Sequence, residues 1–146
     1  MRPIAAALGL MLAACQPAPP EAHKAAFPGD AGPGAWAGLS PGDTLRFSGT
    51  EPFWGGQAEG GSLTWQTPDD QSGTTIPVTR FAGRNGLGLS GTLAGAAFEM
   101  AVSEAPCSDG MSDRRYPFTV TVRRGGETLR GCGWSERHPY SGPKQP

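Results

Sequence analysis

Two polar clusters hold the side chains best suited to chemistry. The first runs from Gly49 to Trp54 around Glu51. The second lies in residues 107–117 and contains the other candidates, Asp109, Asp113, Arg114, Arg115 and Tyr116. Pairs of carboxylates perform general acid and base catalysis in many hydrolases. One hypothesis is therefore a hydrolase of cell-wall or lipid material that uses Glu51 and the Asp109/Asp113 loop.

The same side chains also allow a binding site or a structural contact. Glu51 stands three residues before Trp54, which is a typical buried residue. A carboxylate partly shielded from water there needs a cation. Arg114 or Arg115 would supply it and lock the two clusters together through a bidentate ion pair. The alternatives are an open polar pocket and a fold-specifying ion pair sealed under Trp54 and Tyr116.

Other catalytic and metal chemistries lack the residues they need. The chain has two histidines, His23 and His138, and neither is spaced with a cysteine as a zinc site requires. Asp109 and Asp113 lack the alternating oxygen ligands of an EF-hand loop. No nucleophile elbow accompanies His138, so a Ser-His-Asp triad is not indicated. We therefore expect no metal and no cofactor.

A short apolar segment precedes the first cysteine. Arg2 supplies a positive charge, and residues 4–12 are apolar and uncharged, which is the pattern of a signal peptide. This run is less than half of the roughly 20 residues that a membrane-spanning helix needs. Ala13-Ala14-Cys15 completes a segment that resembles the lipobox of bacterial lipoproteins. The alternative is an ordinary signal peptide, residues 1–14, with a cysteine at the junction by chance.

The lipobox resemblance implies a membrane anchor on Cys15. It implies cleavage before this residue, a diacylglycerol thioether on its sulfur and acylation of the new amine. Two or three acyl chains hold a protein stably, because each buried methylene contributes about 0.8 kcal/mol. Gln16 follows, whereas the inner-membrane retention signal is an aspartate. The resemblance thus implies the outer membrane, on its periplasmic face, with the membrane as a partner.

Two further cysteines, Cys107 and Cys132, remain after Cys15. An even number of cysteines in an exported chain predicts a disulfide. Closing a loop of about 25 residues stabilises a fold by roughly 3 kcal/mol in the chain-entropy model. The alternative is a pair of buried free thiols.

Composition divides the chain into a tether and one domain. Residues 15–38 are rich in Pro, Ala and Gly without hydrophobic periodicity, which predicts a tether. Residues 39–146 suffice for one folded domain, on which Trp36 and Leu39 are expected to dock. The polar segment from His138 to Pro146 is expected to fray. The formal net charge is −1 and no Lys/Arg-rich run occurs, so nucleic acid is not an expected partner.

Apolar and polar residues alternate from Thr44 onward, which is the period of half-buried strands. The alternating runs lie within residues 44–47, 63–66, 76–81, 87–93, 98–103, 116–123 and 127–134. Asn85-Gly86 predicts a type I′ hairpin turn, and Pro77 predicts a sheet edge or a strand start. We expect an all-β domain of seven or eight antiparallel strands, as a small meander barrel or, alternatively, a two-sheet sandwich.

The last hairpin has a predictable register. If Gly125-Gly126 is a two-residue turn, Arg124 faces Glu127 and Val122 faces Leu129. An ion pair and an apolar pair then fall on opposite faces of the sheet. Cys132 lies opposite Thr119, so a disulfide would fasten the segment around Cys107 to the last strand.

The two polar clusters also resemble a known protein family. The segments that carry the likeness are Gly49-Thr50-Glu51-Pro52-Phe53-Trp54, Cys107-Ser108-Asp109-Gly110-Met111-Ser112-Asp113, Tyr116-Pro117 and Gly131-Cys132. They are similar to motifs of a family of bacterial envelope lipoproteins and membrane-associated proteins without an established activity. The resemblance covers most of the chain after about Ser40. It implies an exported β-rich domain and assigns no catalytic role to any residue.

Three functions are compatible with these observations. The first is a non-enzymatic envelope module that binds a small ligand, a glycan or a protein. Small lipid-anchored barrels that inhibit lysozyme are one version of it, on fold-level analogy alone. The second is a structural or assembly factor of the envelope, and the third is the hydrolase. We favour the first, because the two aspartates of one turn-rich loop are weak support for hydrolysis.

Overall fold

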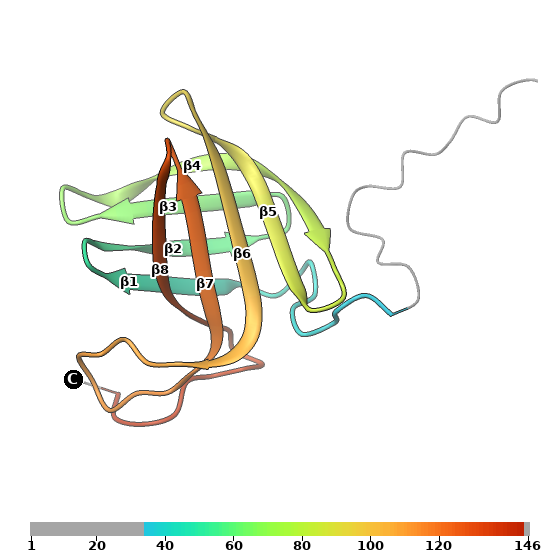
Figure 1. Ribbon diagram of the computed structural model, residues 1–146, viewed down its shortest axis with the longest axis vertical. Coiled ribbons are helices and arrows are strands. Elements are labelled where there is room, and N and C mark those ends of the chain that lie inside the picture. Colours follow the sequence, from blue (N-terminus) through green and yellow to red (C-terminus); the bar gives the residue numbers. More distant parts are fainter. Residues whose placement is uncertain (1–33, 145–146) are drawn as a thin grey trace, which may run out of the picture.

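The computed structural model describes residues 34–144. The expected signal peptide, the lipidation site at Cys15 and most of the expected tether lie outside these residues. Eight strands follow one another along the described chain (Figure 1). Their bounds are β1 Leu45–Thr50, β2 Phe53–Glu59, β3 Ser62–Thr67, β4 Asp70–Ala82, β5 Gly86–Leu93, β6 Ala96–Cys107, β7 Tyr116–Arg124 and β8 Glu127–Trp134.

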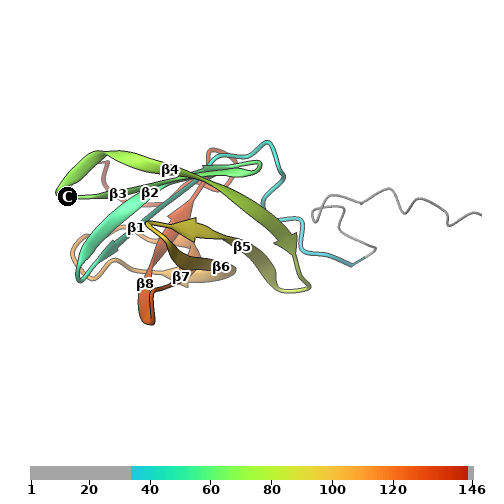
Figure 2. The same cartoon turned by 90° about the horizontal axis from the view of Figure 1, so that it is seen from above.

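The strands form a closed antiparallel barrel in meander order. Each strand pairs with the next, and β1 pairs with β8 through Arg46 with Trp134, Phe47 with Gly133 and Ser48 with Cys132. Strands β1–β3 run across the direction of β6–β8 (Figures 1 and 2). The predicted eight-stranded meander barrel is therefore confirmed, and the two-sheet sandwich is not formed. Within residues 34–144, no helix has the length and apolar character of a membrane span.

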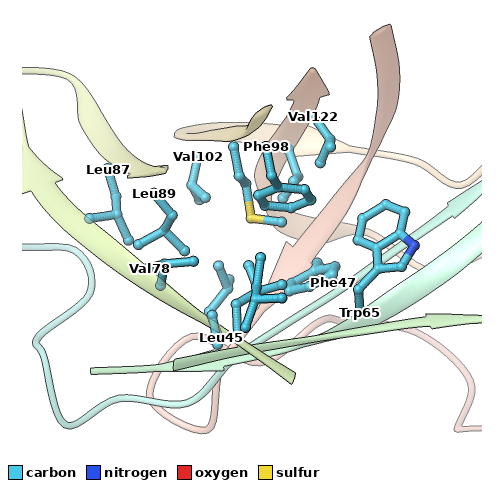
Figure 3. Close-up of a cluster of buried hydrophobic side chains, with 14 of the residues drawn as sticks. Leu45, Phe47, Trp65, Val78, Leu87, Leu89, Phe98, Val102 and Val122 are labelled. Carbon is cyan, nitrogen blue, oxygen red and sulfur yellow. The ribbon is translucent and has the colours of Figure 1, made fainter. Parts of the chain in front are cut away.

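Side chains fill the inside of the barrel. Alternation along each strand turns one set of residues inward, as in β7, where Phe118, Val120 and Val122 are fully buried. Aromatic rings occupy the side nearest β2 and β3, with Trp54 and Trp65 stacked at 5.0 Å between ring centroids. Phe47, Phe98 and Trp65 converge in Figure 3, and Leu87, Leu89 and Val78 continue the core. A filled interior of this kind is typical of eight-stranded barrels.

Glycines at the β1–β8 seam make room for Trp54. A Cβ atom on Gly49 would lie 2.3 Å from the Trp54 ring. A Cβ atom on Gly131 would lie 2.2 Å from the backbone oxygen of Ser48 and 2.9 Å from the same ring. The indole therefore occupies the space that side chains at these two positions would need. In the Gly131-Cys132 pair, the glycine allows this close approach and the cysteine forms a cross-link.

Cys107 and Cys132 form the predicted disulfide, with their Cα atoms 5.5 Å apart. Cys107 ends β6 beside Tyr116 of β7, and Cys132 lies in β8 beside Thr119 of β7. The register of β6 with β7 shifts between Glu104 and Cys107. The bond thus connects the two strands on either side of β7, next to this irregularity.

The register predicted for the last hairpin is confirmed. Arg124 pairs with Glu127, Val122 with Leu129 and Thr119 with Cys132. The Arg124 and Glu127 side chains form an ion pair at 3.6 Å. Gly125 and Gly126 both have positive φ, of 55° and 86°, which a two-residue turn demands.

Two turn predictions need correction. The hairpin between β4 and β5 exists, but Gly86 belongs to β5 and neither it nor Asn85 has a positive φ. Gly86 instead allows a close approach, since a Cβ there would lie 2.1 Å from the Val102 oxygen. Pro77 lies inside β4, where pairing passes from β3 at Ser62 to β5 at Gly91. A closed barrel has no free edge, so proline occupies this crossover instead.

Both flanking segments pack on the barrel. The Trp36 indole donates to Glu104 at 3.1 Å and meets Phe118 edge-on at 5.7 Å. Leu39 is 3 % exposed, so the predicted docking of Trp36 and Leu39 is confirmed. The expected fraying of the tail is wrong for its described part, 138–144. Ser141 forms a backbone bridge to Arg115, and the Tyr140 ring packs on Tyr116.

We expect Gly131→Ala to destabilise the barrel by about 1–3 kcal/mol, because the added methyl group overlaps the Ser48 carbonyl and the Trp54 ring. Gly88→Ala is the matched control. It is also a strand glycine, but its Cβ would lie 3.8 Å from the nearest atom. Denaturant unfolding measures both variants. Equal stability of the two would contradict the role assigned to Gly131.

Candidate functional site

Asp109 organises the loop between β6 and β7. Its carboxylate accepts hydrogen bonds from the backbone N–H groups of Met111 at 3.0 Å and Ser112 at 2.8 Å. The hydroxyl groups of Ser112 and Tyr116 donate to its other oxygen at 2.7 and 3.1 Å. Partial burial raises the pKa of Asp109, but these hydrogen bonds outweigh it and hold the pKa at about 2. Asp109 is therefore an ionised loop support at neutral pH.

The two arginines of this cluster bind the C-terminal segment and the loop. Arg114 donates from Nε to the Pro143 carbonyl at 2.7 Å and also to the Lys144 carbonyl. Its guanidinium lies 4.8 Å from the centre of the Tyr140 ring. Arg115 donates to the Ser108 hydroxyl at 3.3 Å. Burial raises the pKa of the Tyr116 phenol, which stays protonated and donates to the loop.

The predicted ion pair between Glu51 and Arg114 or Arg115 is wrong. Glu51 is exposed in the turn between β1 and β2, and the ion pairs within residues 34–144 do not include it. The two clusters meet through a different contact, because the Thr50 hydroxyl donates to the Asp109 carbonyl at 3.4 Å. An exposed carboxylate does not need a protein cation, so the fold requires none beside Glu51.

The remaining predicted residues also fail to form one shared site. Trp54 points into the barrel and Asp113 is exposed. Arg115 and Tyr116 border a hollow of about 390 Å³ with Glu104 and Pro139, but Glu51, Asp109 and Asp113 do not line it. The structure thus brings Asp109, Tyr116 and the loop together and leaves the carboxylates apart.

A different site lies on the outer face of the barrel. The pairing partners there run from β8 to β4 as Trp134 with Arg46, Arg46 with Gln57, Gln57 with Thr64 and Thr64 with Thr75. All five positions belong to the outward set of their strands, because Leu45, Phe47, Leu63 and Ile76 form the inward set. They form one transverse row of about 19 Å, at about 4.8 Å per strand spacing.

This row borders a hollow that we call the outer groove. Its volume is about 570 Å³. Its lining residues are Arg46, Phe47, Ser48, Gly55, Gly56, Gln57, Thr64, Gln66, Ser72, Thr75 and Trp134. A second hollow of about 590 Å³, the adjoining groove, shares Arg46 and Trp134 with it and extends to Tyr140 and Lys144. The two hollows therefore meet at Arg46 and Trp134.

Gly55 is an outward position of β2 and leaves the middle of the outer groove without a side chain, and the backbone of the inward Gly56 also lines the groove. Gly56 has a φ of 149°, and a Cβ there would lie 1.9 Å from the Thr64 oxygen. A Cβ on Gly55 would lie 3.0 Å from the Phe47 oxygen. The glycines are thus needed for close strand approach, and their bare backbone lets a ligand come near the sheet.

Most polar side chains of the outer groove keep free hydrogen-bonding capacity. Within residues 34–144, the side chains of Arg46, Ser48 and Gln57 and the Trp134 indole N–H have no side-chain hydrogen bond or ion pair of their own. Thr64 and Thr75 bond each other at 2.9 Å, and Gln66 donates to the Gln71 carbonyl. Arg46 is the charged residue of the groove. The arrangement suits a hydroxyl-rich ligand that carries negative charge or none.

The sequence alone does not predict the outer groove. Alternation places Arg46, Gln57 and Thr64 on outward positions, but outward polar residues are ordinary on any half-buried strand. The only distinguishing local signal is the Gly55-Gly56 pair within an alternating run. Trp134 joins the row only because β8 pairs with β1.

No family model matches the chain, and no match was found among curated proteins or among solved structures. The family resemblance of the two polar clusters stays a prediction.

We expect Asp109→Asn to lower the free energy of unfolding at pH 7 by about 1–2 kcal/mol, because an amide is a weaker acceptor for the four donors. The folded-state pKa of about 2 lies below the ordinary 3.8. The carboxylate therefore stabilises the fold above about pH 4, and this contribution is lost as the pH falls toward 2. Denaturant unfolding from pH 2 to 7 should show a steeper loss for the wild type than for the variant.

Asp113→Asn is the matched control, since Asp113 lies in the same loop but is exposed. It should leave the stability at pH 7 unchanged. An Asp109→Asn variant as stable as this control would overturn the loop-supporting role of Asp109.

Proposed function

We propose that this protein is a lipid-anchored, non-enzymatic binding module of the bacterial envelope that holds an envelope glycan in the outer groove. The observation that carries the proposal is the transverse row Trp134–Arg46–Gln57–Thr64–Thr75 beside a glycine floor. It offers an elongated hollow with unused hydrogen-bonding groups and an aromatic side chain. Such a combination is suited to binding a hydroxyl-rich chain.

Three features favour a glycan over other ligands. The interior is filled by core residues such as Phe98 and Phe118, both 0 % exposed, so a ligand binds outside. The barrel is closed, so no free strand edge is offered to an extended peptide. The groove walls are rich in amide, hydroxyl and guanidinium groups, whereas interfaces with proteins usually have an apolar centre.

The candidate carboxylates support a catalytic role less well than the outer groove supports binding. The Asp109 carboxylate accepts four hydrogen bonds from the protein and is ionised near neutral pH. It is therefore unsuited to donate a proton. Glu51 and Asp113 are exposed, and none of the three carboxylates lines the hollow beside Tyr116. These observations favour binding over hydrolysis.

Anchoring at Cys15 would place the domain within reach of the cell wall. The chain from Cys15 to Gly34 spans at most about 65 Å when extended, at about 3.3 Å per residue. The described chain begins beside the β4–β5 connection, where the Trp36 N–H donates to the Gly83 carbonyl at 2.7 Å. The outer groove lies on other strands, β8, β1, β2 and β3 with the start of β4 (Figure 1). A tether at that place leaves the groove accessible.

We expect Cys15→Ser to release the protein from membranes, because serine cannot form the thioether that carries the diacylglycerol. Fractionation of envelopes and mass spectrometry of the mature N-terminus measure this. The variant should appear in the soluble periplasmic fraction. Persistent recovery with the outer membrane, or a wild-type N-terminus without lipid, would refute the anchor.

We expect the full chain to co-sediment with purified peptidoglycan sacculi or to bind purified lipopolysaccharide. Gln57→Trp should abolish this binding, because an indole at this outward position fills the groove. Ser90→Trp is the matched control, since Ser90 is exposed on β5, away from the groove. Equal binding of both variants, or no binding of the wild type to either material, would argue against the proposed function.

A further inference from the structure

We propose that Arg46 and Trp134 form a subsite for an acidic sugar, in which the Trp134 ring supports the sugar ring and Arg46 binds its carboxylate. The inference rests on the proposed function and adds the class of sugar unit that the groove selects. The shared chemistry is a pyranose bearing a carboxylate. The lactyl-substituted sugar of peptidoglycan and the uronic acid of a polysaccharide are its two sources.

Arg46 lies where the two hollows meet. It is exposed on the outer face of β1, and it lies in register between Trp134 of β8 and Gln57 of β2. Both the outer groove and the adjoining groove are lined by it. A ligand that passes from one hollow to the other therefore crosses this guanidinium.

The guanidinium of Arg46 is available to bind a ligand. Several other arginines hold structural partners: Arg123 pairs with Glu99, Arg124 with Glu127 and Arg137 with Asp43. Arg46 has no ion-pair or hydrogen-bond partner among the side chains of residues 34–144. The other charged groups that border the two hollows, Glu136 and Lys144, line the adjoining groove alone. A guanidinium binds a carboxylate through two parallel hydrogen bonds, which a neutral sugar cannot supply.

Two neighbouring aromatic rings hold the Trp134 indole in place. Its half-buried ring packs against Tyr116 at 5.4 Å and meets Tyr140 edge-on at 5.8 Å between centroids. These contacts hold the indole in one orientation while it lines both hollows. The electron-rich face of an aromatic ring attracts the C–H groups of a sugar, and a preordered ring loses little entropy on binding.

The register joins these groups into one subsite. Directly opposed residues on neighbouring antiparallel strands have their Cβ atoms about 4.5–5.5 Å apart. A sugar ring on Trp134 therefore brings a substituent to Arg46, and the next unit of the chain meets the free amide of Gln57 over the glycine floor. Trp134 selects for a ring, Arg46 for an acid, and Gln57 for hydroxyl groups.

The test compares acidic and neutral disaccharides on the full-length chain in detergent. The probes are a disaccharide containing N-acetylmuramic acid, a digalacturonate, and a neutral disaccharide of N-acetylglucosamine. Calorimetric titration should show at least about tenfold tighter binding of one or both acidic probes than of the neutral one. The acidic probe that binds tighter identifies the source. Nuclear magnetic resonance should show a shift of the Trp134 indole N–H signal, assigned with Trp134→Phe.

Arg46→Gln should remove the preference, weakening the acidic probe about tenfold and leaving the neutral probe unchanged. Arg130→Gln is the matched control, because Arg130 is another exposed strand arginine outside both hollows. It should leave both affinities unchanged. The melting temperature of Arg46→Gln should equal that of the wild type, since the side chain holds no structural partner.

Each other outcome overturns the subsite. Equal affinity for acidic and neutral probes, or full preference retained in Arg46→Gln, excludes Arg46 as the selecting group. If sacculi or lipopolysaccharide still bind and Gln57→Trp still blocks them, the proposed function stands without this subsite. If neither disaccharides nor these polymers bind, the subsite and the proposed function fail together.

Discussion

The pairing of β1 with β8 is the contact on which the rest of the structure depends. It closes the barrel, and it succeeds because Gly49 and Gly131 leave space at the seam for the Trp54 indole. Trp54 then stacks on Trp65, which meets Phe98 edge-on at 5.6 Å. Among the described residues, the indole N–H groups of Trp54 and Trp65 have no hydrogen-bond partner, so apolar packing outweighs the loss of two donors at this place.

Closure also determines where chemistry can take place. A barrel of eight strands has an interior just wide enough for its own side chains. Functional groups are therefore left to the loops and the outer face. The loop between β6 and β7 is used for support, since Asp109 gathers four donors and Arg114 holds the C-terminal segment. The outer face keeps the unengaged side chains, and the seam itself brings Trp134 beside Arg46.

The lower end of the barrel in Figure 1 is braced by contacts far apart in sequence. The Cys107–Cys132 disulfide connects the strands on both sides of β7, and Tyr140 packs on Tyr116 and Trp134. These rings hold one wall of the adjoining groove. The second polar cluster, residues 107–117, thus positions Trp134 through Tyr116 and serves the groove indirectly.

Local patterns in the sequence determined a large part of this fold. Alternation identified the inward residues of β6 and β7, the even pair of cysteines identified the cross-link, and Gly125-Gly126 determined the register from Arg124–Glu127 to Thr119–Cys132. The inward residues and the register depend on near neighbours in the sequence, and the cross-link was predicted from the expectation that the chain is exported. Only the tertiary structure decided that β1 joins β8, that Glu51 stays in solvent, and that residues 138–144 pack on the barrel. The alternation of apolar and polar residues, together with the turn residues, specifies which face of the sheet a side chain occupies. Its neighbours on that face depend on which distant strands pair, and closure of the barrel sets that pairing.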